Sequence, residues 1–209
     1  LGIRQILLAY NTRNEIGDGI LEKPDAGLST FGYRVIEEMN RVGMLIDMSH
    51  AGIRTSLEVI EVSKDPILFS HSNAQGIHPH PRNLTDEQIK AIAKKEGVIG
   101  INGMGLILGE AKPTTEKLVS HINYISQLVG SVDHIALGLD VIHFQEMLPV
   151  FFEKSGVEYP KGYLGSMEGL QPENIDDIIE ALFRHRYSYQ DIEKILGGNF
   201  LRIASRVWK

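Results

Sequence analysis

Short, unbroken apolar runs alternate with amphipathic stretches along the chain, and this alternation limits the possible folds more than any other feature. The five apolar runs of strand length cover residues 5–10, 44–48, 66–70, 98–102 and 134–140. Continuous apolar strands are typical of a parallel sheet that is buried on both faces, because half-exposed strands alternate apolar and polar residues. Strands that alternate with helices predict an α/β fold built around such a sheet.

The stretches between the strands carry signals that begin and end helices. They predict helices near residues 31–39, 55–62, 85–93, 115–129, 172–182 and 188–196, and a final helix that ends near residue 208. Ser29 or Thr30 is placed to cap the first helix, and Thr85 with Gln88 forms a capping box. Asn199 is predicted to cap the last helix. The loops after the strands cover residues 11–27, 72–84, 103–113 and 141–171.

Composition restricts the possible partners and cofactors. A chain of 209 residues is long enough for one domain with a proper core, and we expect residues 1–209 to form a single domain. The net charge of -6 gives no attraction for nucleic acid or an anionic membrane surface. With no cysteine, any metal must be held by His, Asp or Glu, and a reducing, cytoplasmic compartment is expected. No apolar run approaches the roughly 20 residues of a transmembrane helix.

The beginning of the sequence is itself informative. Leu1 leads almost directly into an apolar strand, with no initiating Met, signal peptide or polar segment before it. Because a chain rarely begins inside its own core, we expect the natural N-terminus to lie elsewhere.

Polar side chains stand at the C-terminal ends of the predicted strands. They are Tyr10, His50, His71, Asn102 and Asp140, one for each strand. In a βα barrel these ends meet at one mouth, where active sites are built. Neighbouring strands lie about 4.8 Å apart, so His50 and His71 on adjacent strands are able to share one metal ion at about 2.1 Å each.

Simpler interpretations exist for the same residues. His50 also fits a hydrogen-bonded core position, with Asp47 as a buried salt-bridge partner. Asp140 also fits a residue that caps the following helix. His78 and His80, in a proline-containing turn, are interpreted as loop residues rather than metal ligands.

Several motifs together resemble those of the membrane (renal) dipeptidase family, in its bacterial form. The matching segments, in the order of the family, are residues 27–32, 38–43, 44–50, 70–74, 80–86 and 197–202. They extend over essentially the whole chain. The resemblance implies a (β/α)8 TIM-type barrel, of which this chain supplies about strands four to eight with their helices.

The resemblance also implies roles for individual residues. His50 and His71 would be ligands of one Zn²⁺ in a two-zinc site, and Arg82 would hold the C-terminal carboxylate of a dipeptide. Asp140 would transfer a proton near a metal-bridging hydroxide. Tyr10 stands where mammalian members carry a substrate-contacting histidine, and its phenol can still donate a hydrogen bond.

Asn102, at the end of its strand, is a further substrate-binding candidate. The family's His-x-Asp pair and its metal-bridging glutamate have no counterpart here, so a missing N-terminal segment is expected to complete the barrel and the site. The segment after Asp140, which reads Asp140-Val141-Ile142-His143, also departs from the family pattern. This departure puts the adjoining part of the substrate pocket in question.

The expected activity is zinc-dependent hydrolysis of dipeptides, and a homodimer is expected from the family. Two alternatives stay open. One is a related barrel amidohydrolase that acts on lactams or N-acyl amino acids. The other is a non-catalytic binding subunit formed from a partial barrel.

Overall fold

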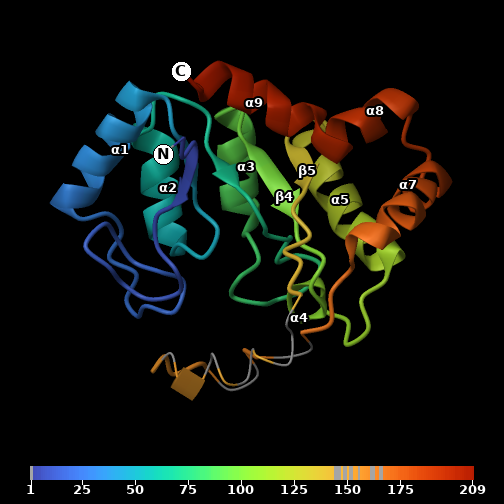
Figure 1. Ribbon diagram of the computed structural model, residues 1–209, viewed down its shortest axis with the longest axis horizontal. Coiled ribbons are helices and arrows are strands. Elements are labelled where there is room, and N and C mark those ends of the chain that lie inside the picture. Colours follow the sequence, from blue (N-terminus) through green and yellow to red (C-terminus); the bar gives the residue numbers. More distant parts are fainter. Residues whose placement is uncertain are drawn as a thin grey trace.

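Five short strands form one parallel sheet whose strands follow the order of the chain (Figure 1). The strands are β1 (Gln5–Leu7), β2 (Leu45–Asp47), β3 (Leu68–Phe69), β4 (Val98–Ile101) and β5 (Ile135–Leu137). Each neighbouring pair is parallel, which confirms the predicted α/β fold class. β1 and β5 are the two edge strands of this sheet, and its closure into a barrel by further strands stays a prediction.

The computed structural model describes residues 2–143, 147, 150, 153–154, 156–160, 163–164 and 167–209. Leu1 and the remaining positions of the predicted loop 141–171 lie outside the described residues. Within the described ranges, every helix is too short or too polar to span a bilayer.

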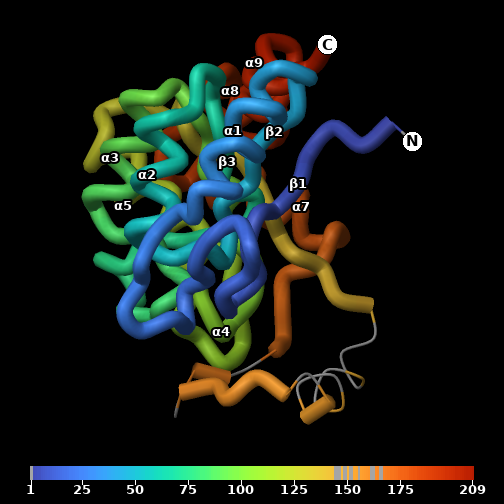
Figure 2. The backbone as a smooth tube through the Cα atoms, turned by 90° about the vertical axis from the view of Figure 1, so that its left-hand side faces the viewer, coloured from blue at the N-terminus to red at the C-terminus, as the bar shows by residue number. Residues whose placement is uncertain are grey.

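The helices connect successive strands or follow the last one. They are α1 (Thr30–Val42), α2 (Ile53–Val62), α3 (Asp86–Lys94), α4 (Gly105–Leu108), α5 (Thr115–Val129), α7 (Ile175–Arg184), α8 (Tyr189–Glu193) and α9 (Asn199–Val207). A 3₁₀ turn, Pro172–Asn174, leads into α7, and a π-helical turn, Lys194–Gly198, joins α8 to α9. In Figure 2, α4 lies close to the orange segment that leads into α7, and Met104 at the start of α4 forms an isolated bridge with Gly169.

Local sequence signals explain where the helices begin and end. Ser29, rather than Thr30, caps α1 by accepting a hydrogen bond from the backbone of Gly32. The helix ends at Gly43, whose φ of 73° lies in the left-handed region that glycine adopts without strain. The predicted capping box of Thr85 and Gln88 is present at the start of α3.

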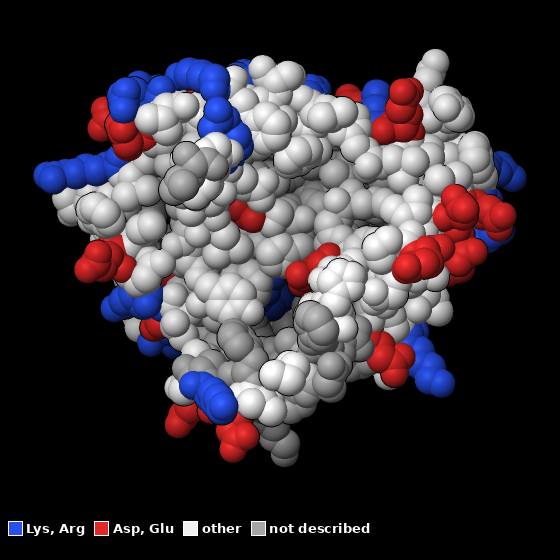
Figure 3. All heavy atoms as spheres, in the orientation of Figure 1, with Lys and Arg blue, Asp and Glu red and all other residues white. Residues whose placement is uncertain are grey.

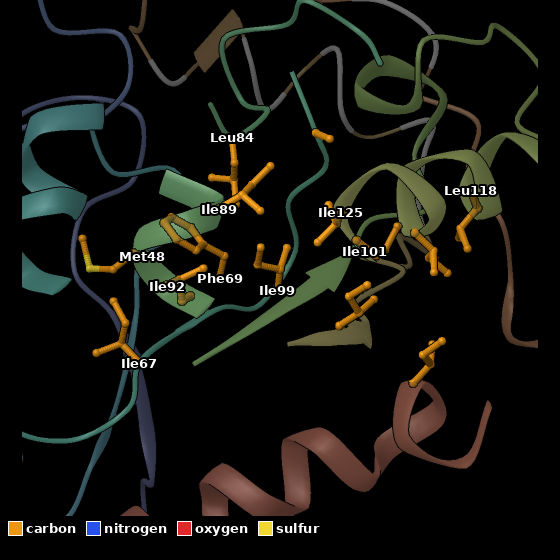
Figure 4. Close-up of a cluster of buried hydrophobic side chains, with 14 of the residues drawn as sticks. Met48, Ile67, Phe69, Leu84, Ile89, Ile92, Ile99, Ile101, Leu118 and Ile125 are labelled. Atoms are coloured by element: carbon orange, nitrogen blue, oxygen red, sulfur yellow. The ribbon is translucent and has the colours of Figure 1, made fainter. Parts of the chain in front are cut away.

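Most of the core lies between the sheet and the helices that cover one of its faces (Figure 4). Fully buried side chains there include Ile46, Phe69, Ile99, Ile101 and Ile122. Burial of each such side chain contributes about 1.5–3 kcal/mol relative to leaving it in water. Contact with helices on this face therefore explains every second residue of the apolar strands.

The opposite face of the sheet is covered at its N-terminal end by α9. There, a second cluster joins Leu45, Leu68, Val98 and Ala136 from the strands to Ile203, Ala204 and Val207 from the helix. Two residues further along each strand, the same face carries Asp47, Ser70, Gly100 and Gly138. A Cβ atom at either glycine would collide with the carbonyl oxygen of Ser70, so this layer is closely packed. These four residues, called the polar layer below, lie directly beneath the residues at the strand ends.

Two details differ from the sequence prediction. The strands are shorter than their apolar runs, because pairing stops where each chain turns into its polar end residue. The prediction for Asn199 is wrong, since its amide does not cap α9 but donates to the carbonyl oxygens of Val132 and Ile135 at 2.7 and 2.8 Å. The helical path continues through Gly198 into α9 without a capped start.

Candidate active site

Four of the five residues predicted at the strand ends line one pocket of about 230 Å³ at the C-terminal ends of the strands. Its lining consists of Tyr10, Asn11, His50, His71, Arg82, Met104, Leu106, Ile107, Asp140, Ile142, Tyr159, Tyr163, Leu164 and Met167. The space-filling view in Figure 3 shows a hollow near the middle of one face, with isolated acidic and basic atoms in a mostly uncharged surface. Five of the six predicted site residues line this pocket, and Asn102 lies behind it.

His50 and His71 face one another across the ends of β2 and β3. Their Nε2 atoms are 3.0 Å apart. Desolvation lowers the pKa of both imidazoles, and the positive charge of Arg82 lowers it further. Both rings are therefore neutral near pH 7, the state in which a histidine can bind a metal.

The ring of His50 is held from two sides by the end of β1. Its Nδ1 lies 2.7 Å from Oδ1 of Asn11, and its plane stacks on Tyr10 with centroids 4.2 Å apart. Asn11 is buried and has a φ of 60°, a left-handed conformation that asparagine tolerates better than most residues. The hydroxyl of Tyr163 also donates to Asn11 Oδ1, at 3.2 Å, so a residue of the 141–171 loop contacts this support.

Tyr10 stands at the pocket with about half of its surface exposed. Partial burial raises the pKa of its phenol, and the nearby Tyr159 and Asp140 raise it further. The phenol therefore keeps its proton at neutral pH and is available as a hydrogen-bond donor.

Arg82 is buried beside the histidine pair, in the loop that follows β3. Its Nη2 donates to the carbonyl oxygen of His71 at 3.3 Å. Desolvation lowers the pKa of the guanidinium, whereas Tyr163, Asp140 and Tyr10 raise it. Among the residues that the structure describes, no carboxylate forms an ion pair with Arg82. A buried cation without a paired anion is costly, and a bound carboxylate would offset that cost.

Asp140 follows β5 and is oriented by Asn102. The backbone φ of Asp140 is 58°, and its Oδ2 accepts a hydrogen bond from Nδ2 of Asn102 at 3.1 Å. Asn102 is fully buried, and its Oδ1 accepts from the backbone of Met104 at 2.6 Å. Asn102 thus affects the pocket by orienting Asp140, which lines it. The segment after Asp140 is not helical up to residue 143, so Asp140 does not cap a helix there.

Other polar residues of the sequence have structural positions. Asp47 is buried, but it accepts hydrogen bonds from Gln5, Ser49 and Ser70, and within the described ranges it makes no salt bridge. His78 and His80 lie in the loop after β3, as predicted. His80 is buried and contacts the backbone oxygen of Tyr163 at 3.0 Å.

Sequence reasoning did not identify several residues that shape the site. Asn11, Ser70 and Tyr163 are in contact with the histidine pair or its support. Asn11 and Ser70 directly adjoin the strand-end residues that were identified, and that adjacency was the available signal. Tyr163 is distant in sequence, and no pattern in residues 141–171 indicates it.

The two histidines fit a metal ion. Two nitrogen ligands at about 2.1 Å and a tetrahedral angle would lie about 3.4 Å apart, close to the observed 3.0 Å. Neutral imidazoles supply the required lone pairs. Within the described part of the chain, no three His, Asp or Glu side chains come together as a ligand set. The geometry and protonation of the pair are thus compatible with two ligands of one ion.

A parallel α/β sheet with polar groups at the carboxyl ends of its strands is the arrangement in which α/β-barrel enzymes build their active sites. The sequence profile of the membrane dipeptidase family (peptidase family M19) matches residues 1–153. The chain belongs to this family, as its motifs predict. The motif at residues 197–202 lies beyond the matched range.

Individual relatives agree with this assignment. The chain is 32% identical to an uncharacterized dipeptidase of Schizosaccharomyces pombe over 213 residues, which is 100% of this chain and 47% of that protein. It is similar to the crystal structure of an amidohydrolase from Pseudomonas aeruginosa, with a TM-score of 0.87, 32% identity, and coverage of 99% of this chain and 65% of that one.

A third similar structure is a metallo peptidase from Rhodobacter sphaeroides, liganded with a phosphinate mimic of the dipeptide L-Ala-D-Ala. It has a TM-score of 0.77 and 24% identity, covering 99% of this chain and 56% of that one, and it supports the fold alone. The chain thus spans about half the length of the S. pombe relative and under two thirds of these solved structures.

Proposed function

We propose that the whole protein is a zinc-dependent dipeptidase and that this chain carries one part of its active site. The observation that carries the proposal is the 3.0 Å approach of two neutral imidazoles, from His50 and His71, in a pocket that also holds Arg82 and Asp140. Membership of the membrane dipeptidase family supports the same reaction class.

His50 and His71 would hold one zinc ion through their Nε2 atoms. The remaining ligands and a second ion, which the family resemblance implies, would come from strands outside this chain. When bound, zinc supplies a Lewis acid that polarises the scissile carbonyl and activates water. The protein's own part is to hold the imidazoles neutral and in a fixed orientation.

Three residues would act on the dipeptide itself. The guanidinium of Arg82 binds the terminal carboxylate through paired hydrogen bonds, which offsets the cost of its burial. The phenol of Tyr10 donates a hydrogen bond to the carbonyl oxygen as negative charge develops there. Asp140, oriented by Asn102, accepts a proton from the attacking water and delivers it to the leaving amine.

The test measures hydrolysis by the whole protein of two substrates, a dipeptide and the same dipeptide with a C-terminal amide. We expect hydrolysis that is lost on chelation and restored by zinc, with the amide about tenfold or more poorer, because it lacks the charge that Arg82 recognises. His71→Ala should abolish zinc-dependent turnover. His185→Ala, which removes an imidazole that pairs with Glu116 on the surface, should leave turnover unchanged.

Other outcomes would contradict the proposal in different ways. Hydrolysis of lactams or N-acyl amino acids without hydrolysis of dipeptides would identify a related amidohydrolase. Absence of both turnover and bound zinc in the whole protein would favour a non-catalytic binding subunit.

A further inference from the structure

A chain of hydrogen bonds leads from His71 into the polar layer of the sheet. Nδ1 of His71 lies 2.7 Å from Oγ of Ser70, and the Ser70 hydroxyl makes a short hydrogen bond with Oδ2 of Asp47. Asp47 is only 3% exposed. Its other oxygen, Oδ1, accepts the backbone N–H groups of Ser49 and Ser70, each at 3.0 Å.

The chemistry of these groups fixes the direction of each hydrogen bond. The Ser70 hydroxyl donates to Oδ2 of Asp47, and this hydrogen bond uses the only proton that a serine hydroxyl carries. Ser70 Oγ must then accept from His71, which places the ring proton of His71 on Nδ1. Nε2 of His71 is left with a free lone pair, and it is this atom that lies 3.0 Å from Nε2 of His50.

We propose that Asp47 and Ser70 are positioning residues that set the tautomer and ring orientation of His71, so that its Nε2 is ready to bind metal. The inference rests on the proposed function only in naming zinc as the metal. The two histidines differ in this respect, because His50 is held by the neutral amide of Asn11 at 2.7 Å. Within the described part of the chain, a carboxylate supports His71, through a serine, and none contacts the ring of His50.

A purely structural role for Asp47 would be to join the ends of β2 and β3. That role belongs to Oδ1, which binds the two backbone N–H groups, whereas Oδ2 accepts from the Ser70 hydroxyl and, at 3.2 Å, from Nε2 of Gln5. The Gln5 amide can turn and present its oxygen to an asparagine at position 47. The two tasks are carried by different oxygens and can be separated. In Asp47→Asn, Oδ1 can continue to accept from the backbone while the new Nδ2 group becomes a donor toward Ser70.

This substitution should reverse the whole chain of donors. The asparagine Nδ2 would donate to Ser70 Oγ, and the Ser70 hydroxyl would turn and donate to Nδ1 of His71. The proton of His71 would then move to Nε2 and block the lone pair that faces His50. A carboxylate that only joined two strands would produce no such change.

The experiment measures ¹⁵N chemical shifts of the His71 ring in the metal-free whole protein, together with zinc affinity by chelator competition. The His71 signals are assigned by their absence in His71→Gln. We expect the Nδ1–H tautomer in the wild type and the Nε2–H tautomer in Asp47→Asn, with zinc affinity about 10- to 100-fold weaker. Ser70→Ala should lose the tautomer preference and about tenfold in zinc affinity.

Ser72→Ala is the matched control. It removes a serine hydroxyl that is buried one residue beyond His71 and has no hydrogen-bond partner within the described residues. We expect its His71 tautomer and zinc affinity to equal those of the wild type. If Asp47→Asn does not fold, the comparison of Ser70→Ala with Ser72→Ala still tests the positioning role, through the His71 tautomer and the zinc affinity.

The outcomes separate this inference from the proposed function. An unchanged His71 tautomer with unchanged zinc affinity in Asp47→Asn, or in Ser70→Ala, would overturn the positioning role even if dipeptides are hydrolysed. A reversed tautomer in a protein that hydrolyses no dipeptide would support the positioning role and remove the proposed function, because the tautomer is read without metal or substrate.

Discussion

A hollow with polar side chains lies at each end of the strands, one at their C-terminal ends and one at their N-terminal ends. The two hollows differ in the contacts that their charged groups make. At the C-terminal ends of the strands, the pocket of about 230 Å³ holds neutral imidazoles and a buried cation with no ion-pair partner among the described residues. At the N-terminal ends, a larger hollow of about 830 Å³ is lined by residues that include Glu96, Asp133, Lys194 and Arg202.

Several charged groups in the larger hollow contact one another or the backbone. Lys194 contacts Asp133 at 2.7 Å, and Arg202 donates to the backbone oxygens of Glu96 and Asp133. Among the described residues that line this hollow, no buried charged side chain stands beside a pair of imidazoles. The comparison shows that the volume of a hollow does not locate a site, whereas groups left ready for a ligand do.

The largest expected effect is a loss in the free energy of unfolding at low pH, and it comes from a histidine at the pocket end. His121 is fully buried near the pocket end, where it accepts from the backbone of Ala74 and contacts the oxygen of Leu108, each at 3.1 Å. Desolvation lowers the pKa of His121 from 6.5 to about 4. The unfolded chain therefore takes up a proton below pH 6.5, while the folded chain resists protonation until about pH 4.

The sign of the effect follows from this difference. The contribution of His121 to the free energy of unfolding is complete above pH 6.5 and is lost as the pH falls to about 4. At about 1.4 kcal/mol per pH unit, the total loss is about 3 kcal/mol. Urea unfolding of the metal-free whole protein at pH 7.5 and pH 4 should show this extra loss in the wild type relative to His121→Gln. Equal losses in both proteins would contradict the prediction.

A smaller but selective effect is expected from replacing arginine with lysine at each end. Arg82→Lys keeps the charge but loses the planar pair of donors, so kcat/KM for a dipeptide should fall about tenfold or more. Arg202→Lys, which removes the two backbone contacts at the other end, should lower Tm while leaving kcat/KM unchanged. Steady-state kinetics and thermal unfolding of the whole protein measure both. An equal loss of kcat/KM in the two variants would remove the distinction between the ends.

The same contrast explains which parts of the molecule the sequence could predict. Parallel strands require their carboxyl ends to meet, so the apolar runs were enough to bring Tyr10, His50, His71 and Asp140 to one pocket. Helix boundaries were predicted at several serine, threonine and glycine caps, as at Ser29, Gly43 and Thr85. These signals depend on residues that are close together in the sequence, and the same contacts are present in the folded structure.

The parts that could not be predicted depend on contacts distant in sequence. Asn199 has the side chain of a helix cap, but two carbonyl oxygens more than 60 residues away compete successfully for its amide. The short helix α4 lacks a side-chain cap at its start, and the glycine that ends it, Gly109, was not enough to predict a helix of one turn. The support of His50 by Asn11 likewise requires β1 to lie beside β2, which no spacing reveals.

The smallest expected effect concerns an exposed ion pair at the N-terminal end of the sheet. Arg206 pairs with Glu96 across a short contact, and the two side chains are 52% and 60% exposed. Arg206 lowers the pKa of the Glu96 carboxyl by hydrogen bonding and by charge. Water screens both groups, so Arg206→Ala should lower Tm of the whole protein by no more than about 1 °C at low salt. Because salt screens exposed charges, the difference should vanish in about 1 M NaCl, and kcat/KM should equal that of the wild type. A drop in Tm of several degrees that persists at high salt would show that this end also depends on a desolvated charge, and the proposed difference between the two ends would then be wrong.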